Sequence, residues 1–285
     1  MTRTAVVQID IPMPGAPADG MLGYCTALSE YSRFAFGRVA RAWSAEHIVL
    51  TSQRYGTLHP CYEKFRIFSD EFAEFDTIVY VDADVVPRGI PPMPDCAPRQ
   101  DGRVQMMALL ETQCYAGRQE GASEVVRRAT RRFQPYWHRL FEQDALMQTS
   151  AHWLNTSYFN SGVMVCDRRL RTHIRSVMNA YITEHPMHDQ NALNRMCFEH
   201  DIRISPLSYR YNSMLHCVMG LDALCEAICS SYFVHFSGDT KSLFANLPSF
   251  DDPEAVKLGI AQWIARGSCS SRWSLIASRA LGHQR

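Results

Sequence analysis

The chain has 285 residues and no net formal charge, and it is 46% hydrophobic and 20% charged. These values are typical of a globular protein with a sizeable core, and the balanced charge argues against a dedicated nucleic-acid-binding protein, which is usually basic. The length allows one large domain, or one domain with appendages.

Segments that would direct the chain to or through a membrane are not predicted. No apolar run approaches the roughly 18 residues that indicate a membrane-spanning helix. The apolar N-terminal segment is short and is interrupted by Gln8 and Asp10, which argues against a signal peptide. The ten cysteines are scattered without a CxxC spacing, so we interpret them as free thiols in a reducing compartment. The sequence therefore predicts a cytoplasmic protein.

The first half of the chain alternates strand patterns with helix patterns. Short apolar, β-branched runs predict strands over residues 4–11, 47–51 and 78–81. Helices are predicted between these strands, over residues 28–43 and 62–72. Proline and glycine predict loops over residues 12–23 and 87–103. This alternation predicts a doubly wound α/β fold with a mixed, mostly parallel central sheet.

The second half continues the α/β pattern with shorter elements. Asn160-Ser161-Gly162 is predicted to form a turn that leads into a strand. Strands are predicted over residues 104–110, 163–166, 202–204 and 232–236. Helices are predicted over residues 167–181, from His188 onward, and between the last two strands.

Two segments are not defined by this pattern. Residues 112–150 carry clustered arginine and aromatic side chains on one or two predicted helices. They form either a solvated basic face or a lid or acceptor-binding insertion. Residues 251–285 are predicted to be a helical extension of a domain formed by residues 1–250. Docking of this extension on the core is favoured, and docking on a second subunit or on a membrane surface remains open.

Asp82 and Asp84 follow the buried strand over residues 78–81. Because side chains alternate along a strand with period two, we expect both carboxylates to point the same way. Two adjacent like charges repel each other unless a cation lies between them, and a hard divalent cation prefers oxygen ligands. Asp-x-Asp by itself also fits a capped strand end with solvated carboxylates. Its place at a predicted strand end favours a metal and phosphate site.

Two further stretches concentrate polar residues at a strand end or a tight turn, namely Asn160-Ser161-Gly162 and His235 to Lys241. Lysine is rare in this chain, because only Lys64, Lys241 and Lys257 occur among 29 basic residues. A lysine ammonium is a compact point charge that suits a phosphate oxygen. Each stretch by itself is weak evidence for a functional site. The evidence becomes stronger because the stretches occur together and in a particular order along the chain.

In this order, the stretches resemble the retaining glycosyltransferases of family 8, which include glycogenin and bacterial lipopolysaccharide galactosyltransferases. Lys64-Phe65 resembles the lysine-containing helix of the family, and residues 80–84 match its Tyr-Leu-Asp-Ala-Asp signature. Residues 159–163 match Phe-Asn-Ser-Gly-Val, and residues 189–194 match Asp-Gln-Asp-Ala-Leu-Asn. His235-x-x-Gly238-x-x-Lys241 matches the C-terminal motif, and the resemblance spans residues 5–245.

The resemblance implies a single GT-A domain that binds a nucleotide sugar, most often a UDP-sugar. It implies that Asp82, Asp84 and His235 hold a manganese or magnesium ion, which acts with a point cation on the diphosphate leaving group. The implied catalytic groups are Asp189, Gln190 and Asn160. The implied donor-binding residues are Gln8, Ile9, Asp10, Lys64, Asp82, Ala83, Asp84, Asn160, Ser161, Asp189, Gln190, His235, Gly238 and Lys241.

Several positions depart from the family pattern. Ser242-Leu243 stands where Pro-Trp usually follows the lysine, and Asn191 replaces the second aspartate of Asp-Gln-Asp. Gln8-Ile9-Asp10 differs from the common base-binding strand, which contains threonine and asparagine. Residues 87–98 and 112–150 match nothing in the family, so the sequence predicts a hydroxyl acceptor on a glycan, lipid or protein without naming it.

Two other functions remain open at the level of sequence. A GT-A nucleotidyltransferase would use a glycine-rich phosphate loop, yet residues 12–23 show neither GxGxxG nor Walker spacing. An inactive module that binds a UDP-sugar would keep the same site residues without transferring the sugar.

Overall fold

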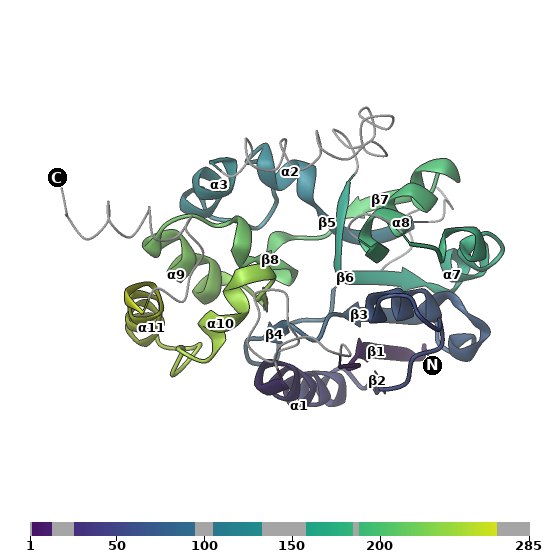
Figure 1. Ribbon diagram of the computed structural model, residues 1–285, viewed down its shortest axis with the longest axis horizontal. Helices are drawn as coiled ribbons and strands as arrows, with labels where there is room; N and C mark the ends of the chain where they lie inside the picture. The colour runs from purple at the N-terminus through teal and green to yellow at the C-terminus, as the bar shows by residue number, and fades with distance from the viewer. Residues whose placement is uncertain (1, 13–25, 95–104, 133–157, 185–187, 267–285) are drawn as a thin grey trace.

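The computed structural model describes residues 2–12, 26–94, 105–132, 158–184 and 188–266 (Figure 1). The predicted loop over residues 12–23 and much of residues 87–103 and 112–150 lie outside these ranges. So does the end of the predicted extension, residues 267–285. Among the described residues, no helix combines the length and the apolar character needed to cross a membrane.

A six-stranded sheet with the order β2-β1-β3-β6-β5-β7 forms the centre of the molecule. Five strands run in the same direction and β6 runs against them, because β6 is antiparallel to both β3 and β5. The predicted α/β fold with a mixed, mostly parallel sheet is therefore confirmed. The strands are β1 (Thr4–Ile9), β2 (Glu46–Leu50), β3 (Thr77–Val81), β5 (Gln105–Leu110), β6 (Phe159–Asp167) and β7 (Arg203–Pro206).

Helices cover both faces of this sheet because β1 and β3 are buried on both sides. On one face, Val6, Val79 and Val81 pack against Phe36 of α1 (Thr26–Ala42). On the other face the strands pack against the elements η1 (Pro60–Phe68), η2 (Asp70–Phe72), α7 (Arg168–Arg175), η3 (Met178–Tyr181) and α8 (His188–Glu199). Continuous apolar runs in the sequence reflect this two-sided burial.

A second, three-stranded sheet with the order β4-β9-β8 adjoins the first. Its strands are β4 (Val85–Pro87), β8 (Ser213–Met214) and β9 (Phe233–His235). Around it lie α2 (Glu111–Tyr115), α3 (Glu124–Arg131), α9 (Leu221–Ser230), α10 (Lys241–Phe244) and α11 (Pro253–Ala265), away from the N-terminus in Figure 1. Short 3-10 segments complete the described chain, namely η4 (Tyr209–Tyr211), η5 (Leu215–Cys217) and η6 (Gly238–Thr240).

Two local predictions were wrong, and one short strand was not predicted. The helix predicted over residues 62–72 is two 3-10 helices, because Ser69 between them has an extended backbone. The strand that was not predicted, Val85–Pro87, directly follows the aspartates, pairs with β9 and ends at Pro87. Asn160-Ser161-Gly162 lies within β6 rather than in a turn, and a register shift between β5 and β6 accommodates it.

Helix α11 is part of the core rather than a loosely attached element. Trp263 is fully buried in the same hydrophobic cluster as α9, and its indole Nε1 donates to Ser242 Oγ over 2.9 Å. Ser242 follows Lys241, so the packing of α11 supports the segment that carries this lysine.

Truncation of Trp263 is therefore expected to destabilise the whole molecule. Trp263→Ala leaves a large cavity and should lower the free energy of unfolding by about 3–5 kcal/mol, measured by urea denaturation. Leu258→Ala on the same helix is the matched control, because Leu258 is 58% exposed and its loss should cost less than about 0.5 kcal/mol. Equal losses in the two variants would show that α11 does not contribute to the core in this way.

Candidate active site

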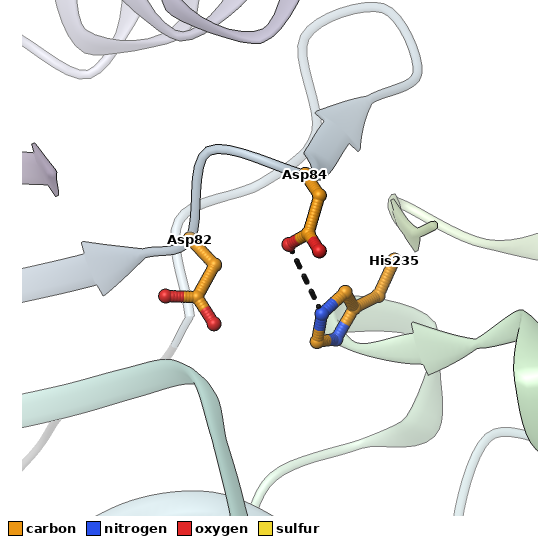
Figure 2. Close-up of side chains that lie close together, drawn as sticks. All are labelled: Asp82, Asp84 and His235. Atoms are coloured by element: carbon orange, nitrogen blue, oxygen red, sulfur yellow. Dashed lines mark ion pairs between the residues drawn. The ribbon is translucent and has the colours of Figure 1, made fainter. Parts of the chain in front are cut away.

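Asp82-Ala83-Asp84 forms the turn that connects β3 with β4. The backbone N–H of Val85 donates to Asp82 O over 3.1 Å and closes this turn. The two carboxylates therefore converge because the chain turns between them, and not because they share one face of a strand as predicted. The turn lies where β3 ends, and β4 leads away into the second sheet (Figure 2).

Asp84 lies beside His235 because β4 pairs with β9. Val85 is opposite His235 in this ladder, and the N–H of Phe236 donates to Asp84 O over 2.9 Å. The imidazole Nε2 of His235 is 3.2 Å from Asp84 Oδ1, and Lys241 Nζ is 3.2 Å from Asp84 Oδ2. Burial alone would raise the pKa of Asp84, but Lys241 and His235 outweigh it and hold this pKa below its usual range.

Asp82, Asp84 and His235 fit a divalent metal ion. Each offers one ligand atom, and these three atoms lie within 4.8 Å of one another. Burial raises the pKa of Asp82, Lys64 only partly opposes this, and Asp84 adds to it. Two neighbouring carboxylates in a buried turn would be stabilised by a cation between them. Two carboxylate oxygens and a ring nitrogen suit a hard or borderline divalent ion better than a soft one.

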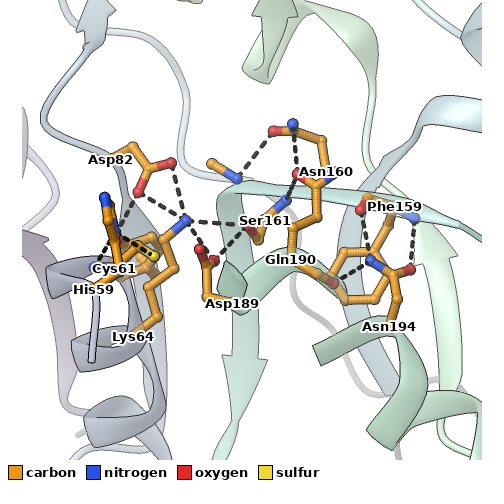
Figure 3. A network of polar contacts seen from close by, with 12 residues as sticks. His59, Cys61, Lys64, Asp82, Phe159, Asn160, Ser161, Asp189, Gln190 and Asn194 are labelled. Carbon is orange, nitrogen blue, oxygen red and sulfur yellow. Dashed lines mark hydrogen bonds and ion pairs between the residues drawn. The ribbon is translucent and has the colours of Figure 1, made fainter. Parts of the chain in front are cut away.

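Lys64 forms a buried ionic cluster on the other side of the turn (Figure 3). Its ammonium lies 3.0 Å from Asp82 Oδ1 and 2.9 Å from Asp189 Oδ2, and it donates to Ser161 Oγ over 3.0 Å. Burial would lower the pKa of Lys64, but Asp189 and Asp82 reverse this and raise it. Ser161 Oγ in turn donates to Asp189 over 2.8 Å. Lys64 is therefore a permanent cation that holds three segments of the chain together.

Asn160 and Gln190 form an amide pair next to this cluster. Asn160 Nδ2 donates to Gln190 Oε1 over 3.1 Å, and both amides donate to Glu111 Oε1, over 3.0 and 3.1 Å. The antiparallel direction of β6 explains this position, because its first residues lie at the same sheet edge as the last residues of β3 and β5. Figure 3 shows Asn160, Ser161, Asp189 and Gln190 in one continuous network with Asp82 and Lys64.

The structure does not bring every predicted residue into this network. The side chain of Gln8 lies on the α1 face, where it donates to Ser32 over 2.9 Å and contacts His47 over 2.9 Å. Asp10 pairs there with Ser29 and Arg33. Ile9, between them, packs into the core on the opposite face. Gly238 begins η6 with φ +62, a conformation that favours glycine, and leads the chain to Lys241.

Several residues of the network were missed at the level of sequence. Tyr80 OH donates to Asp82 Oδ1 over 2.5 Å, and burial and Asp82 raise its pKa, so it remains a neutral donor. Burial and Asp189 likewise raise the pKa of the Cys61 thiol. Glu111 shows the signal that identified Asp82, a carboxylate directly after an apolar strand. Asn212, between η4 and β8, shows no local signal.

Gly162 is required by close packing rather than by its backbone angles. A Cβ atom at this position would lie 2.4 Å from His235 Cε1 and 2.9 Å from Asn160 Oδ1. Gly162→Ala should therefore displace the imidazole, weaken manganese binding at least about tenfold and destabilise the protein by about 1–3 kcal/mol.

Manganese titration and thermal denaturation measure these two effects. Gly37→Ala, in helix α1, is the matched control, because its Cβ would meet only side-chain atoms, those of His47 at 3.3 Å and of Arg41 at 3.9 Å. We expect this control to keep wild-type stability or to gain some, since alanine favours a helix. Wild-type metal affinity in Gly162→Ala would contradict the close-packing explanation.

The six-stranded mixed sheet flanked by helices is the fold of the GT-A class of glycosyltransferases. The family model described as "Glycosyl transferase family 8" matches residues 48–242. The chain belongs to this family and is a glycosyltransferase. A comparison with curated protein sequences finds no match.

Solved glycosyltransferase structures are similar to this chain at low sequence identity. A glycosyltransferase involved in glycosylation of the major capsid of PBCV-1 has a TM-score of 0.51 at 11% identity, covering 84% of this chain and 96% of that one. An active-site mutant of LgtC has a TM-score of 0.47 at 14% identity, covering 93% and 99%. GlyE of Streptococcus pneumoniae TIGR4 has a TM-score of 0.41 at 13% identity, covering 95% and 66%. At 11% identity, the similarity to the first of these structures supports the fold alone.

Proposed function

We propose that this glycosyltransferase is metal-dependent, takes a UDP-sugar as donor and transfers the sugar with retention of its anomeric configuration. The observation that carries the proposal is the convergence of Asp82, Asp84 and His235 beside Lys241. Around this turn, the carboxylates of Asp82, Asp84 and Asp189 outnumber the ammonium groups of Lys64 and Lys241. A divalent cation would balance this excess of negative charge.

Each residue has a role that follows from its position. A manganese or magnesium ion held by Asp82, Asp84 and His235 would supply Lewis-acid stabilisation of the leaving diphosphate. Lys241 is 25% exposed at its side chain, and on this proposal its ammonium binds a diphosphate oxygen and balances the charge that develops there. Lys64 is buried and holds Asp82 and Asp189 in place.

The sugar subsite is assigned to the amide pair and Asp189. Asn160, Gln190 and Asp189 carry the hydrogen-bonding groups at this part of the sheet edge, and we assign them contacts with the hydroxyls of the donor sugar. Asn160 and Gln190 are amides, and the amide oxygen of Gln190 already accepts two hydrogen bonds. The carboxylate of Asp189 is held by Lys64 and Ser161. Retention would then follow from attack by the acceptor hydroxyl on the side of the leaving group. The acceptor class remains a hydroxyl of a glycan, lipid or protein.

A panel of nucleotide sugars tests this proposal without knowledge of the acceptor, because water slowly replaces a missing acceptor. Release of UDP from one UDP-sugar, dependent on manganese and abolished by EDTA, is the expected result. Full activity in EDTA would overturn the metal dependence. Tight binding of UDP and manganese without any turnover would indicate an inactive donor-binding module. Pyrophosphate release from a nucleoside triphosphate and a sugar phosphate would instead indicate a nucleotidyltransferase.

A further inference from the structure

The orientation of the polar side chains at the site can be deduced from one backbone N–H group. The N–H of Gly162 points at the side chain of Asn160, and the atom that receives it lies 2.9 Å away. A backbone N–H can only donate. The atom of Asn160 at this position is therefore the oxygen Oδ1, and its Nδ2 is directed toward Gln190 and Glu111.

This orientation propagates to Asn212 and from there to His235. Asn160 Oδ1 is also 2.9 Å from the side-chain amide of Asn212, and two oxygens would repel each other at this distance. Asn212 must therefore turn its Nδ2 donor toward Asn160. Its Oδ1 then faces the imidazole Nδ1 of His235 over 2.9 Å. Because Oδ1 can only accept, Nδ1 of His235 carries a proton.

We propose that Asn212 is a positioning residue that selects the histidine tautomer required at the metal site. With the proton on Nδ1, the lone pair of a neutral His235 lies on Nε2, the nitrogen that faces Asp84 at 3.2 Å. Ligation by histidine requires this arrangement, in which the second ring nitrogen is held by a hydrogen bond. The inference rests on the metal dependence of the proposed function.

The environment of Asn212 supports a defined role for its amide. Asn212 is fully buried, and both ends of its side chain have partners. It lies directly before β8, whose Met214 is paired with His235 of β9. The imidazole is therefore held by the sheet through its backbone and by Asn212 through its ring. The ring of His235 has little room to move, because it closely approaches Gly162.

A second backbone N–H, that of Ser161, determines the orientation of the Gln190 side chain in the same way. The N–H of Ser161 points at Gln190 over 3.3 Å, which identifies the receiving atom as Oε1. The Nε2 of Gln190 then donates to Glu111 and to Tyr158 OH, over 3.1 and 2.9 Å. Two successive N–H groups of β6 thus set the orientation of His235 and of Gln190. Each donor atom named in this chain of contacts meets at least one acceptor.

Asn212 accepts a hydrogen bond from His235 and donates one to Asn160. Two substitutions of Asn212 test these two hydrogen bonds separately. Asn212→Leu has a similar volume and removes both, so manganese affinity should fall about 10- to 100-fold. Asn212→Asp keeps an oxygen for the Nδ1 proton, so its manganese affinity should remain within about threefold of wild type or become tighter. Manganese binding is followed by electron paramagnetic resonance of the free ion, without any sugar donor. Gln119→Met is the control, because Gln119 is a buried amide bonded to Thr130 outside the site.

The tautomer itself is measured by ¹⁵N NMR of histidine-labelled protein loaded with diamagnetic magnesium. Wild type should show a neutral His235 with its proton on Nδ1, assigned by comparison with His235→Gln. A proton on Nε2 in wild type would overturn the proposal, even if Asn212→Leu failed to fold. Wild-type affinity in Asn212→Leu, or equal losses in the Leu and Asp variants, would also overturn it. If these results hold while no nucleotide sugar is turned over, the proposed function fails and the role of Asn212 remains.

Discussion

Asp84→Asn is expected to reduce manganese-dependent sugar transfer by about 1,000-fold. The substitution removes the carboxylate charge that faces His235 and Lys241, each over 3.2 Å. A metal ion contributes several kcal/mol of charge stabilisation, and roughly 4 kcal/mol corresponds to a thousandfold change in rate. The rate of UDP release at saturating donor, measured over a range of manganese concentrations, checks this expectation.

The control for this effect is Asp222→Asn. Asp222 lies on α9 with a side chain that is 82% exposed, and it contacts Lys257 over 3.4 Å. This variant should retain wild-type activity because an exposed ion pair contributes little. Asp84→Asn removes an anion that Lys241 and His235 stabilise, and this removal can also change the stability of the protein. The thermal midpoint of the variant must therefore be measured together with its activity. A folded Asp84→Asn protein with undiminished transfer would refute the role assigned to this carboxylate.

Lys64→Met is expected to destabilise the protein by about 3–5 kcal/mol, because it leaves two carboxylates without their shared buried cation. Lys64 contacts Asp82 and Asp189 at 3.0 and 2.9 Å, with a side chain that is 5% exposed. The free energy of unfolding in urea measures the effect. Lys257→Met is the matched control, since this lysine is 48% exposed and its loss should cost less than about 1 kcal/mol.

A double variant shows whether the cost arises from unpaired charge. Asp189→Asn removes one of the two stranded carboxylates, so Lys64→Met combined with Asp189→Asn should be more stable than Lys64→Met alone. An additive loss would mean that the two residues act independently. The double variant also provides a folded protein for comparison if Lys64→Met does not fold.

The pH dependence of this stabilisation follows from the direction of the pKa shift. The folded state raises the pKa of Lys64 above its ordinary value of 10.5, so it binds the proton more tightly than the unfolded state. The contribution of Lys64 is therefore fully present below about pH 10 and is lost as the pH rises through the raised pKa. The stability difference between wild type and Lys64→Met should remain large from about pH 7 to pH 10 and shrink at higher pH.

The alternation of strands and helices was predictable because it depends on local patterns. The runs that became β1 and β3 are mostly apolar and are buried on both faces, and the spacing in α1 is helical. The stretch from residue 62 to 72 has a similar spacing, yet it forms two 3-10 helices separated by Ser69. Periodicity alone does not distinguish these two kinds of helix.

The groups at the site were predictable where their chemistry is concentrated in a short motif. Asp82, Asp84, His235 and Lys241 were expected together, and the structure brings them together. Gln8 and Asp10 were expected beside them, yet their side chains interact with α1 and β2. Each alternate residue of β1 faces α1, and the sequence motif carries no information about that face.

What the sequence determined by itself about this protein is its family, the order of the six strands of the central sheet along the chain, and the place of Asp82 and Asp84 at the end of a buried strand. Only the tertiary structure decided how these pieces meet. The antiparallel course of β6 places Asn160 at the end of β3, and the pairing of β4 with β9 places His235 against Asp84. Asn212 acquires its role from these two events, because its partners His235 and Asn160 are 23 and 52 residues away in the sequence. Local patterns specify elements, whereas pairing between distant strands specifies which side chains share a site.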